Sequence, residues 1–177
     1  MIALLKEMEL YYILMKPPIR FPRLVAETLA GRTLVIPDSL DRRIPLIVMA
    51  FRRHAQPAVD SWLVPVSRRY ADAPGFSWYE LPMLGGGWRT VSGFIESGMR
   101  SGIDPAHHDR VATYYGDTRR VRDVLRVEDL DTAHAFLLDE QGVVIWSQTG
   151  WAGRRRMDEL CVRIDERLSS LADCHEP

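Results

Sequence analysis

The chain has 177 residues, 46% hydrophobic and 27% charged, which is typical of one globular domain with a short extension. Its 23 basic and 24 acidic residues give a formal net charge of -1, which argues against bulk binding of nucleic acid. Two cysteines do not make a disulfide framework, and no apolar run reaches the roughly 20 residues that a membrane span requires.

The first 16 residues place apolar side chains at helical spacing and are followed by Pro17 and Pro18, which predicts an N-terminal helical extension over residues 1–20. Charges interrupt this segment and no small-residue cleavage site follows it, so it does not resemble a signal peptide. We therefore expect a cytoplasmic protein. The apolar face of the helix has two candidate partners, the surface of its own domain and a membrane surface or other protein.

Predicted strands and helices alternate along the rest of the chain. Apolar runs bounded by turn residues predict strands at 33–36, 44–51, 76–81, 110–115, 133–138 and 143–147. Apolar residues at helical spacing predict helices at 58–66, 91–99, 117–125 and 154–171. Asp117 is a suitable N-cap for the third of these helices, and residues 139–142 form a hairpin turn that ends in glycine.

The run at 44–51 is continuously apolar, which is typical of a central strand that is covered on both faces. Strands that alternate with helices require crossovers and parallel pairing, whereas the last two strands form an antiparallel hairpin. The predicted fold is α/β and thioredoxin-like, with a central mixed sheet, helices on both faces and a C-terminal hairpin plus helix. It occupies residues 21–173 and leaves a tail at 174–177.

Both features of a thioredoxin-type redox site are absent at their expected positions. Such a site needs a thiolate at the N-terminus of the first long helix, where the helix dipole lowers the thiol pKa. If Phe51 ends the central strand, the positions of the two redox cysteines are held by Gln56 and Val59. The cis-proline that normally precedes the hairpin in this fold is also absent, because Thr132 and Ala133 stand there.

Neither cysteine restores such a site by its position in the sequence. Cys161 belongs to the apolar stripe of the last helix, and Cys174 follows thirteen positions later, ~20 Å away along a continuous helix. A disulfide needs Cα atoms within about 7 Å of each other. His107 and His108 are adjacent in a loop and lack a distant third ligand, so we expect no metal and no cofactor.

The turn before the first long helix is the best candidate for a recognition surface. It holds Arg52, Arg53, His54 and Gln56. Free N–H groups at a helix N-terminus favour anions, so an anion or a small molecule is one candidate ligand there. Glu80 ends a predicted strand near the same edge of the sheet, and we expect it to pair with one of the two arginines.

The same stretch resembles a known family. The residues Phe51, Arg52, Gln56, Ser61, Trp62 and Pro65 match the pattern F-R-x(3)-Q-x(4)-S-W-x(2)-P. Further matches are Tyr79, Glu80, Tyr115, Gly116, Asp117, Leu125, Phe136, Leu137, Leu138, Asp139, Gly142, Trp146 and Gly150. Their order and spacing resemble the assembly factors that help to build the membrane sector of mitochondrial ATP synthase.

This resemblance implies a thioredoxin-like domain without redox cysteines and without catalytic residues. It implies a chaperone that binds a newly made hydrophobic subunit of the proton channel, and it adds Ser61 and Trp62 to the candidate binding residues. The N-terminus lacks an Arg- and Ser-rich transit peptide. A bacterial relative is therefore expected, and a mitochondrial protein only if a presequence precedes this sequence.

Two functional hypotheses follow from the sequence. The first is a redox-inactive protein-binding module that assists assembly of a membrane protein complex such as ATP synthase. The alternative is a thiol-dependent enzyme, similar to a peroxiredoxin or a thiol reductase, that uses Cys161 or Cys174.

Overall fold

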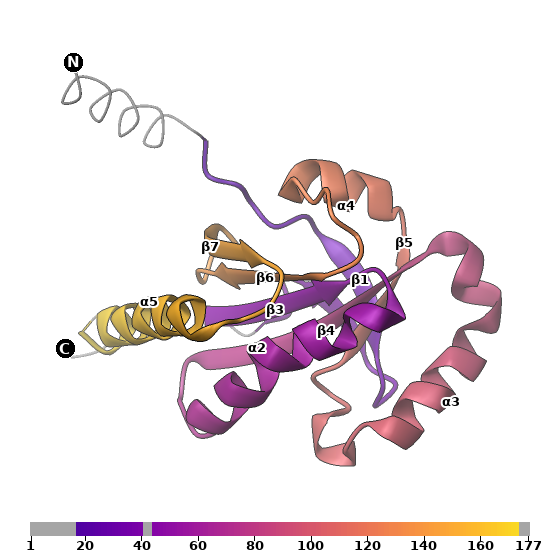
Figure 1. Ribbon diagram of the computed structural model, residues 1–177, viewed down its shortest axis with the longest axis horizontal. Helices are drawn as coiled ribbons and strands as arrows, with labels where there is room; N and C mark the ends of the chain where they lie inside the picture. Colours follow the sequence, from indigo (N-terminus) through magenta and orange to yellow (C-terminus); the bar gives the residue numbers. More distant parts are fainter. Residues whose placement is uncertain (1–16, 41–43, 174–177) are drawn as a thin grey trace.

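The structure is a computed structural model that describes residues 17–40 and 44–173, except for the side chains of residues 89–95 and 173 (Figure 1). The predicted N-terminal helix at 1–16, the residues at 41–43 and the tail at 174–177, which includes Cys174, lie outside the described residues. None of the helices in the described part of the chain is long and apolar enough to cross a lipid bilayer.

Seven strands form one mixed sheet in the order β2-β1-β5-β4-β3-β6-β7. The strands are β1 (Leu24–Thr28), β2 (Thr33–Ile36), β3 (Ile44–Ala50), β4 (Phe76–Gly85), β5 (Ala112–Gly116), β6 (Ala133–Leu138) and β7 (Val144–Thr149). β3, β4 and β5 pair in parallel, and the other neighbouring strands pair antiparallel. The last residues of β3, β4, β5 and β7 therefore lie at one edge of the sheet, which we call the carboxyl edge.

Helices connect and follow these strands. They are α2 (Gln56–Arg69), α3 (Ser92–Gly102), α4 (Thr118–Leu125) and α5 (Arg154–Asp173), with short 3-10 helices η1 (Arg53–Ala55), η2 (Gly86–Val91) and η3 (Pro105–His107). As predicted, Asp117 caps α4, because its carboxylate accepts hydrogen bonds from the main-chain N–H groups of Arg119 at 3.0 Å and Arg120 at 3.2 Å. α2 and α5 both begin at the carboxyl edge, after β3 and β7, and run in the same direction along the sheet (Figure 1).

The sheet separates two hydrophobic clusters, as a sheet with helices on both faces requires. One cluster joins α2 and α5 to β3, β4 and β6, with Trp62, Val66 and Leu160 at its centre. The other joins α4 to β1, β3, β4 and β6, with Val121 and Leu125 from the helix. All of the first six residues of β3 are buried, which confirms the prediction of a central strand covered on both faces.

The sequence analysis missed β1 and misplaced several element ends. The LVAET run of β1 alternates between buried and exposed residues, the pattern of a strand with one covered face. The predicted strand at 76–81 continues to Gly85, so the glycine run at 85–87 is divided between β4 and η2. The return strand of the hairpin is Val144–Thr149 and not 143–147.

Candidate functional site

The turn between β3 and α2 lies at the carboxyl edge, as the sequence predicts. Gln56 is the first residue of α2, and the turn before it contains Arg52, Arg53 and His54, all three exposed. His54 Nε2 lies 3.2 Å from a carboxylate oxygen of Asp131, which comes from the loop before β6. Both partners are largely exposed, so solvent screens this contact and it contributes little to stability.

A buried carboxyl group lies directly below this turn. Glu80 in β4 is 7% exposed. The Gln56 amide donates a hydrogen bond to Asp60 Oδ1 at 3.0 Å, and the Gln56 side chain also contacts Glu80. Burial raises the pKa of Glu80 from 4.5 to about 7, the negative charge of Asp60 also raises it, and the Gln56 contact lowers it.

The predicted pairing of Glu80 with Arg52 or Arg53 is therefore replaced by a contact with an amide. The physical reason is that Glu80 does not end its strand but lies in the middle of β4, five residues before Gly85. Its side chain is consequently covered by α2, whereas both arginines are exposed in the turn.

Ser61 and Trp62 hold a loop in place. Trp62 is 0% exposed, and its indole Nε1 donates a 2.7 Å hydrogen bond to the carbonyl of Gly150. The Ser61 hydroxyl accepts a 3.0 Å hydrogen bond from the main-chain N–H of Ala152. Trp62 also packs edge-to-face on Trp146 with a centroid distance of 5.6 Å. The pair thus fastens the β7–α5 loop onto α2, and a partner protein cannot contact the Trp62 side chain.

Two exposed tryptophans lie at the carboxyl edge and were missed by the sequence analysis. Trp88 in η2, after β4, is 57% exposed, and Trp151, just after β7, is 60% exposed. Because β3 lies between β4 and β7 in the sheet, the turn at Arg52–Gln56 lies between the two. The available signal was a tryptophan directly after a glycine in a predicted loop, where no core periodicity explains it.

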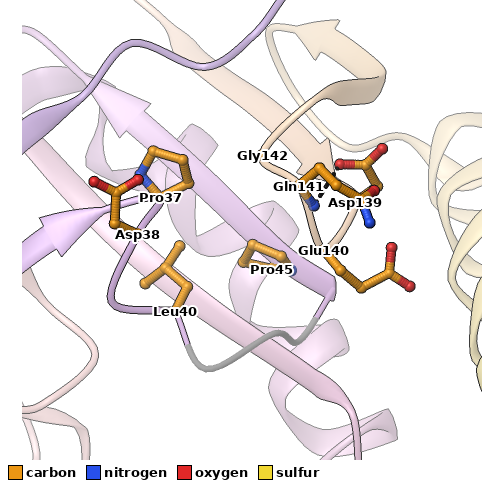
Figure 2. A pocket seen from close by; sticks show the side chains of 8 residues that line it. All are labelled: Pro37, Asp38, Leu40, Pro45, Asp139, Glu140, Gln141 and Gly142. Carbon is orange, nitrogen blue, oxygen red and sulfur yellow. Dashed lines mark hydrogen bonds between the residues drawn. The ribbon is translucent and has the colours of Figure 1, made fainter.

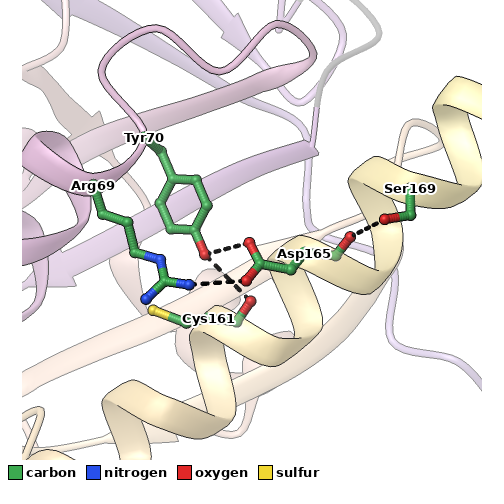
Figure 3. A network of polar contacts seen from close by, with 5 residues as sticks. All are labelled: Arg69, Tyr70, Cys161, Asp165 and Ser169. Atoms are coloured by element: carbon green, nitrogen blue, oxygen red, sulfur yellow. Dashed lines mark hydrogen bonds and ion pairs between the residues drawn. The ribbon is translucent and has the colours of Figure 1, made fainter.

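Cys161 lies next to Arg69 and Tyr70 (Figure 3). These two residues are at the end of α2, so Cys161 is far from Gln56, the first residue of that helix. Cys161 is buried, and its carbonyl oxygen is 3.2 Å from the hydroxyl of Tyr70, the residue that follows α2. The same hydroxyl donates to Asp165 at 2.7 Å, and the Arg69 guanidinium contacts that carboxylate at 3.0 Å. Burial and these hydrogen bonds raise the pKa of Tyr70 far above its usual range. Since α2 has 14 residues, about 20 Å of helix separates Cys161 from the first turn.

The side chains of His107, His108 and Asp109 do not converge to form a metal site. His107 packs edge-to-face on Trp78 at a centroid distance of 5.2 Å, and a ring nitrogen of His108 lies 3.0 Å from a main-chain carbonyl. Asp109 forms a 2.8 Å ion pair with Arg32. Within residues 17–40 and 44–173, no group of three or more His, Cys, Asp and Glu side chains is arranged to hold a metal ion.

A pocket of about 100 Å³ lies at the other edge of the sheet, next to the hairpin turn (Figure 2). Its acidic side chains already have partners. Asp38 pairs with Arg23 at 3.0 Å, Glu140 pairs with Arg167 at 2.7 Å, and Asp139 accepts two main-chain hydrogen bonds within its own turn. The residues lining the pocket are Pro37, Asp38, Leu40, Pro45, Asp139, Glu140, Gln141 and Gly142.

No protein-family model matches the chain, and no curated protein matches it. Solved structures match it over most of their length. A thiol:disulfide interchange protein from a Bacteroides species is 14% identical with a TM-score of 0.59, covering 90% of this chain and 94% of that chain.

Two further solved structures are similar to the chain over most of their length. An exposed lipoprotein thioredoxin from Streptococcus pneumoniae is 10% identical with a TM-score of 0.57, covering 82% of this chain and 99% of its own. An uncharacterised conserved protein from Geobacillus kaustophilus is 13% identical with a TM-score of 0.60, covering 88% of this chain and 84% of its own. The chain therefore has a thioredoxin-like fold, as its sequence predicts.

Proposed function

We propose that this chain is a thioredoxin-like protein-binding module that works without a thiol and assists the assembly of a membrane protein complex. The observation that supports the proposal is the first turn of α2, which begins Gln56-Pro57-Ala58-Val59 and holds no cysteine where the sequence analysis expects the redox pair of a thioredoxin-type site. An amide and an aliphatic side chain cannot form a disulfide or attack one. Cys161 is buried at the far end of the same helix, which also favours binding over thiol chemistry.

The proposed contact surface is the carboxyl-edge surface, which we define by the residues Arg52, Arg53, Gln56, Trp88 and Trp151. Tryptophan and arginine are enriched at the centres of protein interfaces, because they supply large contact areas together with hydrogen-bond donors. Two mostly exposed tryptophans and two exposed arginines at the same edge of the sheet have no role in the two cores of this fold. Their location at one edge supports a protein partner there.

The proposed client is an apolar subunit of the ATP synthase membrane sector, as the family resemblance implies. Three residues of the matched pattern, Phe51, Arg52 and Gln56, lie in the turn of the carboxyl-edge surface or next to it. Ser61 and Trp62 hold the β7–α5 loop that presents Trp151. The pattern therefore includes both a surface and the residues that support it.

A thiol assay tests the first part of this proposal. The full chain and its Cys161→Ser, Cys174→Ser double variant are compared in insulin reduction and in peroxide reduction. We expect both proteins to stay at the background rate. A rate in the original chain that disappears in the double variant would show that the chain is a thiol-dependent enzyme, which is the alternative function.

A capture experiment tests the second part. The full chain is immobilised and exposed to detergent-solubilised membranes of its native host, and retained proteins are identified by their peptides. We expect retention of a membrane subunit of ATP synthase, and we expect Trp151→Ala and the Arg52→Ala, Arg53→Ala pair each to reduce it by about tenfold or more. Val162→Ala, which removes an exposed side chain of α5 away from this edge, is the matched control. Equal retention by all variants would exclude the carboxyl-edge surface.

A further inference from the structure

The β7–α5 loop, residues 150–153, exposes a large side chain on a main chain that is held on both sides of it. Trp151 is 60% exposed, whereas the next residue, Ala152, is 5% exposed and belongs to the core. Before the tryptophan, the Gly150 N–H donates a 2.8 Å hydrogen bond to the carbonyl of Ala133 in β6. The Gly150 carbonyl and the Ala152 N–H are both bonded to side chains of α2. The loop is therefore ordered around an exposed tryptophan.

Arg156, in the first turn of α5, adds the contacts that fix the main chain of Trp151 itself. Its Nη1 donates to the carbonyl of Trp151 at 3.1 Å and to the carbonyl of Thr149, the last residue of β7, at 2.8 Å. This nitrogen carries two hydrogens, so it can donate one to each carbonyl. One guanidinium group thus joins the end of β7, the loop and the start of α5.

The helix dipole does not explain the arginines at this place. α5 begins Arg154-Arg155-Arg156 and has no acidic residue in its first turn. The N-terminal end of a helix carries partial positive charge, so cations there are unfavourable. The two carbonyl bonds of Arg156 offset that cost. Arg154 and Arg155 are exposed, and the 3.6 Å ion pair of Arg155 with Glu159 is weakened by solvent.

We propose that the β7–α5 loop is preformed to insert Trp151 into an apolar recess of the protein client, that acidic groups of the client border this recess, and that Arg156 is the positioning residue. The inference rests on the proposed function, which supplies the client. Tryptophans that contribute most to protein interfaces fill well-packed pockets of the partner. A loop that is ordered before binding avoids the entropy cost of ordering it in the complex.

The acidic border follows from the two exposed arginines next to the tryptophan. An entirely apolar surface placed over Trp151 would remove water from Arg154 and Arg155 without giving them new partners, which is unfavourable. Carboxylates at the rim of the recess would pair with both guanidinium groups and would also select the correct partner.

NMR relaxation of the isotopically labelled full chain tests whether the loop is preformed and whether Arg156 positions it. We expect the amides of residues 150–152 to have order parameters of about 0.85, the value of a rigid backbone, and to fall to about 0.6 or below in Arg156→Met. Removing a cation from the first turn does not weaken α5, so this loss would not reflect fraying of the helix. Arg163→Met, on the exposed surface of the same helix, is the matched control and should change nothing in the loop.

Two results of the relaxation experiment would overturn the role of the loop. Low order parameters in the original chain would show that the loop is not preformed. Equal order parameters in the original chain and in Arg156→Met would show that Arg156 does not position it.

A capture experiment on detergent-solubilised membranes of the native host tests the partner. The readout is the amount of ATP synthase membrane subunit that the immobilised chain retains. We expect Arg156→Met to reduce it about fivefold through the lost order of the loop, and Arg163→Met to leave it unchanged. In a chain that already carries Trp151→Ala, Arg156→Met should have no further effect, because it acts through the tryptophan. The Arg154→Gln, Arg155→Gln pair should also reduce retention about fivefold.

The outcomes separate this inference from the proposed function. If the original chain retains no ATP synthase subunit, the proposed function and the recess are both wrong, and the order parameters still decide the role of Arg156. If the subunit is retained equally by Arg156→Met, or if the effects of Arg156→Met and Trp151→Ala simply add, Arg156 does not act by positioning Trp151. Unchanged retention by the Arg154→Gln, Arg155→Gln pair would exclude the acidic border.

Discussion

Burial of the Glu80 carboxyl makes the folded state less stable whenever that group is ionised. Its pKa rises from 4.5 to about 7 on folding, so the folded chain binds this proton more tightly than the unfolded chain. Below pH 4.5 the group is protonated in both states and its ionisation has no effect on stability. Stability falls as pH rises from 4.5 to about 7, and above that range the loss amounts to about 3 kcal/mol.

Glu80→Gln should therefore stabilise the protein at high pH and not at low pH. At pH 8 we expect the free energy of unfolding to increase by up to about 3 kcal/mol, because a neutral amide replaces a buried charge of similar shape. At pH 4 the two proteins should be equally stable. Urea denaturation at both pH values measures the difference. The matched control is Glu166→Gln on the exposed surface of α5, for which we expect no such dependence on pH. An equal effect of Glu80→Gln at both pH values would contradict this account.

At the scale of elements, the hairpin between β6 and β7 rests against the turn that follows β2. Gly142 has a φ of 77°, and a Cβ added to it would lie 2.5 Å from Cγ of Pro37. The Gly142 carbonyl also accepts a 2.9 Å hydrogen bond from Phe21. Two elements from opposite ends of the chain are thus held together where only a glycine fits.

Gly142→Ala should destabilise the protein more than Gly31→Ala does. Gly31 has a similar φ of 81°, but no atom lies within 4 Å of an added Cβ, so this control measures the backbone cost alone, about 1 kcal/mol. At position 142 the methyl group also collides with a rigid proline ring, which adds about 1–3 kcal/mol. Urea denaturation of both variants measures the difference. Equal losses would mean that the hairpin turn moves away from Pro37 without cost.

Local patterns in the sequence predicted the elements that depend on local chemistry. The continuous apolar run of β3, the Asp117 cap of α4 and the hairpin turn before β7 each follow from a few neighbouring residues. β1 was missed because its run is short and follows a proline-rich stretch. Its pairing with β5 joins Glu27 to Thr113, a contact between distant parts of the chain that no local pattern reports.

The candidate binding site was predicted only in part, because its contacts also join distant parts of the chain. The sequence identified Gln56 and Glu80, but their contact depends on how α2 packs over β4, and 24 positions separate them. Trp62 belonged to two conflicting patterns: the apolar stripe of α2 placed it in the core, and the family pattern placed it in the binding site. The structure supports the stripe, because the indole fills the space between α2 and Trp146.

At the scale of the whole molecule, the two ends of α2 offer different environments for a thiol. Cys161 is buried near the last turn, and a cysteine introduced in the first turn can be compared with it in the same protein. Gln56→Cys places a thiol at the N-terminus of a 14-residue helix, where the helix dipole favours the thiolate. We expect it to react with iodoacetamide at least about tenfold faster than the buried Cys161 of the same folded chain. Peptide mass analysis of the labelled protein measures both rates. Equal rates would show that Asp60 and Glu80 cancel the effect of the helix at this position.

The common direction of α2 and α5 gives the molecule an electrical polarity that its net charge of -1 conceals. Both helices direct the positive ends of their dipoles toward the carboxyl edge, where the exposed residues Arg52, Arg53, Arg154 and Arg155 also lie. At low ionic strength an anionic partner would therefore orient the protein so that the carboxyl edge faces it. The association rate of the two would fall as ionic strength rises. Electrostatic attraction can in this way orient a nearly neutral protein before any of its side chains contacts the partner.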